Sequence, residues 1–361
     1  MKQKIISTII LLAIIIIAPS CDESTAPESR KSVRDYTWTL DTLKIPDANQ
    51  NLMRSIYGAN SKDIYLVGHN SGSPMNNGNG GMWHYDGNEW SIVILRAEIG
   101  PVGTLNSVHG SSSNNVWAVG GSIDYATILQ YNGVNWKKHL VSYNRDGLSG
   151  TPLARNEVFD VYAESETEVW ACGAGGLVYH YDGTSWDVDT LDNPLTTGTF
   201  HLRKIVGNGS NKYMLSTNAK DWNTSSHYYI YKYTEGTWEI IDTFTSEEYY
   251  SFGVTDMYYS SFGELHTVGP EIFKYQINDW EQISVDYSTW IWSMFDYGRS
   301  NMISVGYGKA FHFNGSDWKE IEALTDSEAF YRAVWMDDKN TFVVGYKTID
   351  NKDKTIVWHG K

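Results

Sequence analysis

One motif recurs along the whole chain and constrains its fold more than any other feature. An aromatic residue is followed five positions later by Trp, and Asn-Gly or Asp-Gly often lies between them, as in Tyr181-Asp182-Gly183 before Trp186. The copies end at Trp90, Trp136, Trp186, Trp238, Trp280 and Trp318. Successive Trp residues are 38 to 52 positions apart. A period of this length with short strands is typical of β-propellers.

A second element precedes each turn, most clearly at 115–120 with the sequence Asn-Val-Trp-Ala-Val-Gly. Such short runs of β-branched and aromatic residues closed by Gly predict strands. A further strand comes before each of them, as at 107–110. Asn-Gly and Asp-Gly provide the positive φ angles of tight hairpins. Each repeat therefore predicts four antiparallel strands, which form one blade.

The two ends of the chain complement each other. The last repeat, from Tyr331 to Lys361, stops before its Trp strand, whereas residues 36–43 resemble residues 185–191 and contain Trp38. We therefore expect an all-β fold, a seven-bladed β-propeller closed by the N-terminal strand pairing into the last blade. Ring closure would remove exposed sheet edges.

The N-terminus has the pattern of an export signal. Lys2 and Lys4 precede an apolar run at 5–18, which is too short to span a membrane comfortably and has signal-peptide flanks. The following Ala-Pro-Ser-Cys at 18–21 resembles a bacterial lipobox. That resemblance implies cleavage before Cys21 and lipidation of its thiol. The alternative is an ordinary signal peptide with an incidental Cys.

This pattern divides the chain into three parts. We expect a lipoprotein signal peptide at 1–20, the acylated Cys21 with a flexible tether at 21–35, and the propeller at 36–361. The protein would lie in the bacterial cell envelope and contact the membrane only through its lipid anchor. The outer membrane or cell surface is favoured, and the periplasmic face of a membrane remains an alternative.

The charge balance excludes some partners. The chain has a net charge of −15, and loss of two lysines with the signal peptide would make it −17. Such a chain should not bind nucleic acid through phosphates or lie flat on an anionic bilayer. Cys172, in a Val-Trp-Ala-Cys-Gly run, is expected to be a buried hydrophobic residue. We expect a monomer.

No motif indicates a cofactor or a metal site. The ten His residues show no HExxH or paired ligand spacing, and there is no phosphate-binding loop or Gly-x-Ser-x-Gly. Asp350 to Asp353 lacks the Gly and the distal carboxylate of a calcium loop. We predict neither cofactor nor metal.

The longest predicted loops share one face of the ring, where rigid scaffolds commonly place binding residues. Aromatic and arginine side chains on this face suit sugar rings or a protein partner. The candidates are Arg145, Arg155, Trp222, Tyr249, Trp290, Trp292 and Tyr331. Arg54, Arg203 and Arg332 occupy matching positions in three innermost strands. Together they would form a clamp for a carboxylate at the channel mouth.

At the level of the repeats, Val-Trp-Ala-Val-Gly followed by Tyr-Asp-Gly-x-x-Trp resembles the BNR/Asp-box-like propellers found in bacterial lipoproteins. It is also similar to propellers of the photosystem II assembly-factor type. The resemblance covers residues 36–361 and implies a fold but no ligand. It departs from sialidases, because Asp86 lies four rather than five positions before Trp90 and no Tyr/Glu nucleophile pair is evident.

We therefore expect a non-catalytic binding or scaffold module for an envelope protein or a polysaccharide. The alternative is a polysaccharide-degrading glycoside hydrolase or lyase. An enzyme would require two or three carboxylates, or a His/Tyr pair, converging at the channel mouth.

Overall fold

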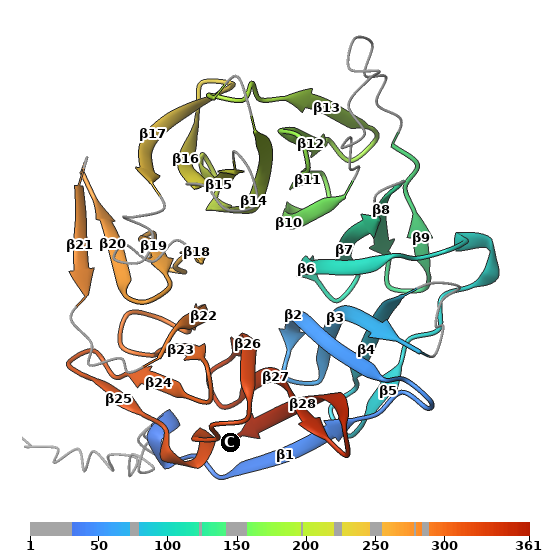
Figure 1. Ribbon diagram of the computed structural model, residues 1–361, viewed down its shortest axis with the longest axis vertical. Coiled ribbons are helices and arrows are strands. Elements are labelled where there is room, and N and C mark those ends of the chain that lie inside the picture. Colours follow the sequence, from blue (N-terminus) through green and yellow to red (C-terminus); the bar gives the residue numbers. More distant parts are fainter. Residues whose placement is uncertain are drawn as a thin grey trace, which may run out of the picture.

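The computed structural model describes residues 31–72, 79–122, 125–141, 157–195, 198–219, 226–245, 255–277, 279–283 and 289–361. These residues form a ring of β-sheets around a central channel (Figure 1). Three one-turn 3₁₀ helices lie at Val33–Asp35, Ala97–Ile99 and Glu322–Leu324. None of the helices among the described residues has the length and apolar character needed to cross a membrane.

Five sheets are four-stranded antiparallel blades. The first is β6 (Thr104–Ser112), β7 (Asn115–Ser122), β8 (Tyr125–Tyr131) and β9 (Trp136–Lys138). The second is β10 (Val158–Ser165), β11 (Glu168–Gly173), β12 (Leu177–Tyr181) and β13 (Trp186–Thr190). The third is β14 (Thr199–Asn208), β15 (Asn211–Ala219), β16 (Ser226–Thr234) and β17 (Thr237–Thr245). The fourth is β18 (Asp256–Tyr259), β19 (Leu265–Val268), β20 (Ile272–Gln276) and β21 (Asp279–Ile283). The fifth is β22 (Ile291–Asp296), β23 (Met302–Gly306), β24 (Ala310–Phe313) and β25 (Trp318–Glu320).

The remaining strands form one eight-stranded sheet, where both ends of the described chain meet. It consists of β26 (Phe330–Met336), β27 (Thr341–Ile349), β28 (Lys352–Gly360), β1 (Trp38–Leu43), β2 (Gln50–Asn60), β3 (Asp63–Ser71), β4 (Gly80–Tyr85) and β5 (Trp90–Ile92). The N-terminal strand β1 pairs antiparallel with β28, with Trp38 opposite Gly360.

The prediction of a seven-bladed propeller is wrong. The sheets are five four-stranded blades and one eight-stranded sheet, because β28 also forms a parallel pair with β2 at Gln50 and Asp353. The β27–β28 hairpin extends far enough for this contact, with Asp350 and Asn351 in its turn at φ 53° and 58°. Gln50 Nε2 donates to Asp353 Oδ2 at 3.0 Å, and Thr355 Oγ1 donates to the carbonyl of Asn51 at 2.7 Å.

The recurrent turn forms the hairpin that its sequence predicts. In the copy at 181–186, Gly183 has φ 93°, and Asp182 Oδ1 accepts the amides of Thr184 and Ser185 at 2.7 and 2.8 Å. The rings of Tyr181 and Trp186 pair across β12 and β13 with their centroids 5.2 Å apart. Equivalent ring pairs close the hairpins that end at Trp90, Trp136, Trp238, Trp280 and Trp318.

The hydrophobic core lies between neighbouring sheets, where each group of buried side chains joins two of them. Aromatic residues of the second strands form its centre: Trp117 in β7 is fully buried and meets Trp186 of the next blade edge to face, with centroids 5.5 Å apart. Cys172 is also fully buried, as predicted.

Histidines repeat in this layer with a structural role. The ring of His180 stacks on Trp170 at 4.1 Å, while its Nε2 lies 3.1 Å from Glu168 Oε2 at the start of the same β11 strand. The same link joins His84 to Asp63, His312 to Asn301 and His359 to Asn340. These His residues therefore stabilise the blades. The described residues contain no group of three or more His, Cys, Asp or Glu suited to a metal ion.

Candidate functional site: the channel mouth

The channel contains a cavity of about 650 Å³ whose rim is built by one repeated backbone feature. In six innermost strands a β-bulge inserts one extra residue near the start of the strand. The extra residues, all of which line the cavity, are Arg54, Asn106, Phe159, Arg203, Trp292 and Arg332. A bulge redirects the side chain of its extra residue. Thr255, which directly precedes β18, also lines the cavity.

The Gly that closes the second strand makes room for this bulge. A Cβ on Gly120 would lie 1.9 Å from the carbonyl oxygen of Thr104, just before the bulge at Asn106. A Cβ on Gly345 would lie 2.3 Å from the carbonyl oxygen of Phe330, just before the bulge at Arg332. The Gly of the sequence motif therefore permits the close backbone approach that positions the residues of the mouth.

Arg54 and Arg332 give the mouth a positive charge, which the Asp256 carboxylate offsets only at longer range. None of the described carboxylates forms an ion pair with either guanidinium. Arg332 stacks over Trp292 with its Cζ 4.2 Å from the ring centroid. Burial and, to a lesser extent, the charge of Arg54 lower the pKa of Arg332. The two arginines therefore repel each other, and an anion between them would relieve this repulsion.

Arg203 occupies the third basic position and is held by the third blade and its neighbour. Its Cζ lies 4.4 Å from the centroid of the Phe159 ring, and its Nε donates to Thr217 Oγ1 at 3.4 Å. Beside Arg54, His69 has a pKa lowered first by burial and then by the charge of Arg54. The mouth therefore combines three guanidinium groups with the aromatic faces of Phe159 and Trp292.

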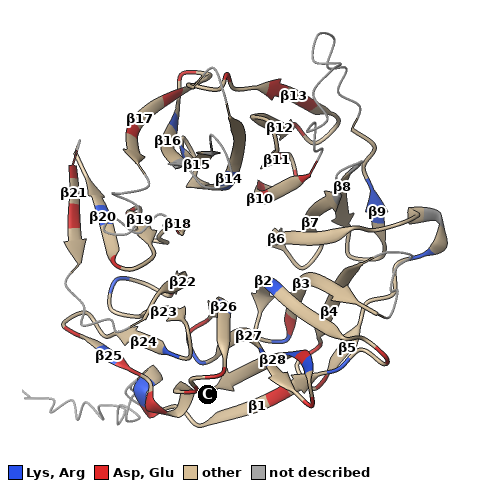
Figure 2. Cartoon of the chain, viewed as in Figure 1, with Lys and Arg blue, Asp and Glu red and all other residues tan. Residues whose placement is uncertain are grey.

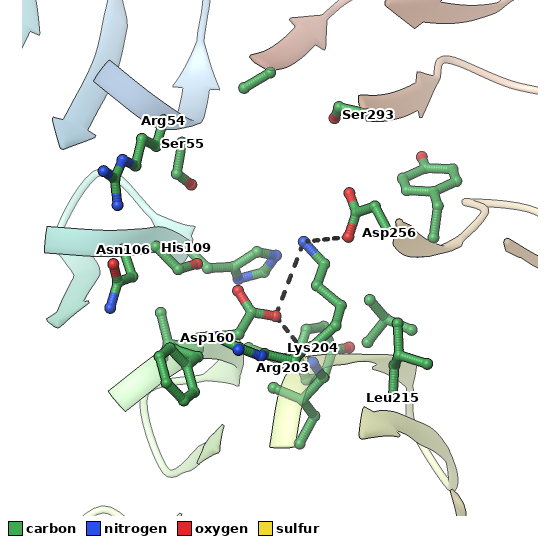
Figure 3. Close-up of a pocket in the computed structure, with 18 of the residues that line it drawn as sticks. Arg54, Ser55, Asn106, His109, Asp160, Arg203, Lys204, Leu215, Asp256 and Ser293 are labelled. Atoms are coloured by element: carbon green, nitrogen blue, oxygen red, sulfur yellow. Dashed lines mark hydrogen bonds and ion pairs between the residues drawn. The ribbon is translucent and has the colours of Figure 1, made fainter. Parts of the chain in front are cut away.

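A second layer of polar residues lies one position further along the same strands. Lys204 Nζ lies 3.4 Å from Asp256 Oδ1 and 3.9 Å from Asp160 Oδ2 (Figure 3). Burial alone would lower the pKa of Lys204, but Asp160 and Asp256 raise it, so the side chain is an ammonium ion at neutral pH. Asp160 is almost fully buried and also accepts the Ile205 amide at 2.9 Å.

This second layer is better suited to stabilising the channel than to catalysis. The carboxylates of Asp160 and Asp256 both face the ammonium group of Lys204, which neutralises part of their charge. Asp160 is already bonded to the backbone of β14, so it is poorly placed to protonate a substrate. His109, which also lines the cavity, has a pKa lowered to about 4 by burial, and its Nδ1 accepts the Ala163 amide at 3.1 Å.

The structure brings together some of the residues predicted for the site. Arg54, Arg203, Arg332 and Trp292 line one cavity. Trp290 is half-buried, donates from Nε1 to Thr255 Oγ1 at 2.6 Å and does not line this cavity. Tyr331 is fully buried and donates to the carbonyl of Leu324 at 2.8 Å, so its assignment to a ligand surface is wrong. Cys21, Arg145, Arg155, Trp222 and Tyr249 lie outside the described residues.

Several lining residues were missed in the sequence. Asn106, Phe159 and Thr255 occupy the rim position, and Asp160 and Asp256 lie one residue further on. Their signal was available, because each stands at the same place in its repeat as Arg54 or the residue after it. Residue type alone does not identify this common position, because it carries Asn and Thr as well as arginine and aromatic residues.

No protein-family profile and no curated protein sequence matches the chain. Solved structures do show the fold. YCF48 bound to a D1 peptide is similar over 89% of this chain and 96% of its own, with a TM-score of 0.61 and 16% identity. YCF48 from Cyanidioschyzon merolae covers 88% of this chain and 98% of its own, with a TM-score of 0.52 and 13% identity. The WD40 propeller domain of Doa1 covers 90% and 97%, with a TM-score of 0.55 and 15% identity. The chain is therefore a β-propeller.

Proposed function

We propose that this protein is a lipid-anchored envelope propeller that binds a carboxylate-bearing segment of a partner protein at its channel mouth, without catalysing a reaction. The single observation that carries this proposal is the pair Arg54 and Arg332, which lack a carboxylate partner among the described residues. Guanidinium groups bind carboxylates through two parallel hydrogen bonds.

Arginines without a carboxylate partner are informative in a chain that has an excess of acidic residues. The chain has 43 acidic and 28 basic residues, and Figure 2 shows acidic positions along the outer strands β13, β17 and β21. Several basic groups elsewhere are paired with carboxylates, as Arg34 is with Asp317 and Lys347 is with Asp326. A chain with this excess of acid that leaves two neighbouring arginines unpaired has a local site for an anion.

A protein partner is favoured over a polysaccharide. The similar structure of YCF48 is of a complex with a peptide, which supports a peptide-binding role for this architecture. The Trp292 ring and the Phe159 ring are already covered on one face by Arg332 and Arg203. The two guanidinium groups therefore reduce the ring surface that is open for stacking on sugars. Binding of a charged group by the guanidiniums fits this arrangement better.

The binding proposal is tested by titrating the protein with two carboxylate polymers, poly-L-glutamate and polygalacturonate. Because the whole molecule is strongly negative, general electrostatics oppose both polymers, so saturable binding reports a local site. We expect poly-L-glutamate to bind and the R54A/R332A variant to lose at least about tenfold in affinity. R96A removes an exposed arginine outside the cavity and is the matched control.

Two results would contradict the proposal: no saturable binding of poly-L-glutamate, or binding that the double variant retains. Tighter binding of polygalacturonate would assign the mouth to an acidic polysaccharide instead. Release of reducing sugars from that polymer would favour the hydrolase or lyase alternative.

The lipid anchor is tested separately. In a bacterial host that processes lipoproteins, the protein is expected to incorporate labelled palmitate and to sediment with membranes. C21S should lose both the label and the membrane association. Membrane association of C21S equal to that of the unmodified protein would show that the anchor is not at Cys21.

A further inference from the structure

Four aromatic side chains form a continuous surface beside the channel mouth, which we call the aromatic shelf: Trp292, Tyr307, Phe330 and Tyr346. The Tyr307 ring contacts the rings of Trp292 and Phe330, with centroid distances of 5.7 and 4.5 Å. The Phe330 ring stacks on Tyr346, with the ring planes 5° apart and the centroids at 5.2 Å. Trp292 also lines the channel cavity and stacks with the Arg332 guanidinium. The shelf is therefore continuous with the site proposed above.

The backbone holds the shelf at the mouth end of two neighbouring sheets. Tyr307 and Tyr346 each directly follow the Gly of the second-strand motif. Phe330 begins the innermost strand β26 and is paired with Tyr346. A β-bridge between Tyr307 and Phe330 joins the fifth blade to the eight-stranded sheet. These backbone contacts bring the three rings together next to the bulge that carries Arg332.

The repeat does not require an aromatic residue after this Gly. Other repeats carry His69, Gly121 and Ala174 at the same place. Tyr307 is 42% exposed, even though its ring contacts two others. The two tyrosines therefore add an exposed aromatic surface in one sector of the ring, where most other repeats do without one. Exposed aromatic rings of this kind are typical of protein interfaces.

The hydroxyl groups of the two tyrosines are available to a ligand. Neither the Tyr307 nor the Tyr346 hydroxyl has a hydrogen-bond partner among the described residues. Both lie near the Arg332 guanidinium, whose pKa they raise against the larger lowering by burial. A phenol hydroxyl both donates and accepts hydrogen bonds. The shelf can therefore bond a peptide carbonyl or an indole N–H next to a carboxylate that Arg332 binds.

The charges around the shelf favour an uncharged side chain on it. The Asp326 amide donates to the Gly308 carbonyl at 2.9 Å, so the segment before β26 lies against the turn that contains Tyr307. Asp326 and Glu328 of this segment pair with Lys347 at 3.0 and 2.8 Å. A carboxylate on the shelf would meet these two acids, whereas a neutral ring would not.

We propose that the aromatic shelf binds an aromatic side chain of the same partner segment whose carboxylate is bound at the mouth. This inference rests on the proposed function and adds the composition of the segment, an acidic residue close in sequence to Trp, Tyr or Phe. Trp292 contacts both Arg332 and Tyr307. An extended chain advances about 3.3 Å per residue, so a separation of about one to three residues connects the two groups.

The test is calorimetric titration of the protein with two blocked heptapeptides, Glu-Glu-Glu-Trp-Glu-Glu-Glu and the same peptide with Ala in place of Trp. We expect the Trp peptide to bind about tenfold more tightly, because the shelf removes part of the indole from water. Leu at the same position should bind about threefold less tightly than Trp, since an aliphatic side chain makes no edge-to-face ring contact. Y307A should bind the Trp peptide only as tightly as the Ala peptide.

The matched control is Y297A. Tyr297 is 46% exposed but follows β22 at the end of the strand remote from Trp292. Y297A should keep the full difference between the Trp and Ala peptides. R54A/R332A should weaken both peptides, because it removes the arginines that bind their carboxylates. The peptide comparison in the unmodified protein needs no variant, so it decides the matter even if Y307A does not fold.

The outcomes separate this inference from the proposed function. If neither peptide bound to the unmodified protein, both would be overturned. Equal binding of the Trp and Ala peptides, a Leu peptide as tight as the Trp peptide, or an unchanged preference for Trp in Y307A would overturn the shelf alone. So would a Y307A variant that lost affinity for polygalacturonate but not for the Trp peptide, because the shelf would then be a surface for sugars.

Discussion

The aromatic layer between the sheets and the mouth of the channel are built on the same repeats but follow them to different degrees. In the aromatic layer the repeated position carries a large aromatic ring in most repeats, as Tyr65, Trp117 and Trp170 show, and His266 and Ile303 are the exceptions. At the mouth the backbone bulge is repeated but the side chain changes, from Arg54 to Asn106 to Phe159. Positions that carry an aromatic ring in most repeats stabilise the ring of sheets. Positions whose side chain differs between repeats while the backbone bulge recurs are available for binding.

The largest expected effect separates stability from binding. Trp117→Ala removes a fully buried ring and should lower the free energy of unfolding by about 3–5 kcal/mol. Urea unfolding at pH 7.5 measures this, with V134A, at a residue 76% exposed, as a control expected to change stability by less than about 0.5 kcal/mol. R332A should stay close to that control. Equal losses for W117A and R332A would mean that the mouth is also part of the stabilising core.

A smaller effect tests whether the glycines link the two regions. Gly120→Ala and Gly345→Ala each place a methyl group against a carbonyl oxygen and should destabilise the protein by about 1–3 kcal/mol. Only G345A adjoins a bulge that carries an arginine, so it alone should weaken poly-L-glutamate binding markedly. If both variants bound the polymer as tightly as the unmodified protein, the glycines would not be needed to position the bulge residues for binding.

The sequence predicted the repeated part of the molecule well and the sheet count poorly. The Asp-Gly turn and the Tyr181–Trp186 pair are local features, and both formed as predicted. The single parallel pair between Gln50 and Asp353 depends on how far one hairpin reaches across the ring, which no local pattern encodes. For the site, the three arginines could be aligned by register, but the burial of Tyr331 could not, because its ring turns toward Leu324 in the core.

The pH dependence of the free energy of unfolding should report on the buried histidines of the blades. Burial lowers the pKa of His139 and His312, which do not line the channel cavity, to about 4. The unfolded chain, with pKa values near 6.5, binds more protons in this range, so stability should fall progressively as the pH is lowered from about 6.5 towards 4. Guanidinium groups do not titrate there. Urea midpoints at pH 7.5 and 5.5 should therefore differ, whereas a midpoint independent of pH would show that these rings are not buried as neutral groups.

The smallest expected effect concerns the chemistry of the arginines. Arg332→Lys keeps the charge but loses the planar fork and the stacking on Trp292. We expect poly-L-glutamate affinity to fall by only a few-fold, less than in R332A. The R332K and R332A titrations should be run at the same ionic strength, because exposed charge interactions are screened by salt. If the two variants bind equally weakly, geometry rather than charge decides recognition.

A crystal structure of the protein grown with glutarate would show directly whether the channel mouth binds a carboxylate. We expect a carboxylate between Arg54 and Arg332 at the channel mouth, in contact with both guanidinium groups. An empty mouth at saturating glutarate would contradict it, as would a mouth in which both arginines pair with carboxylates of the protein itself.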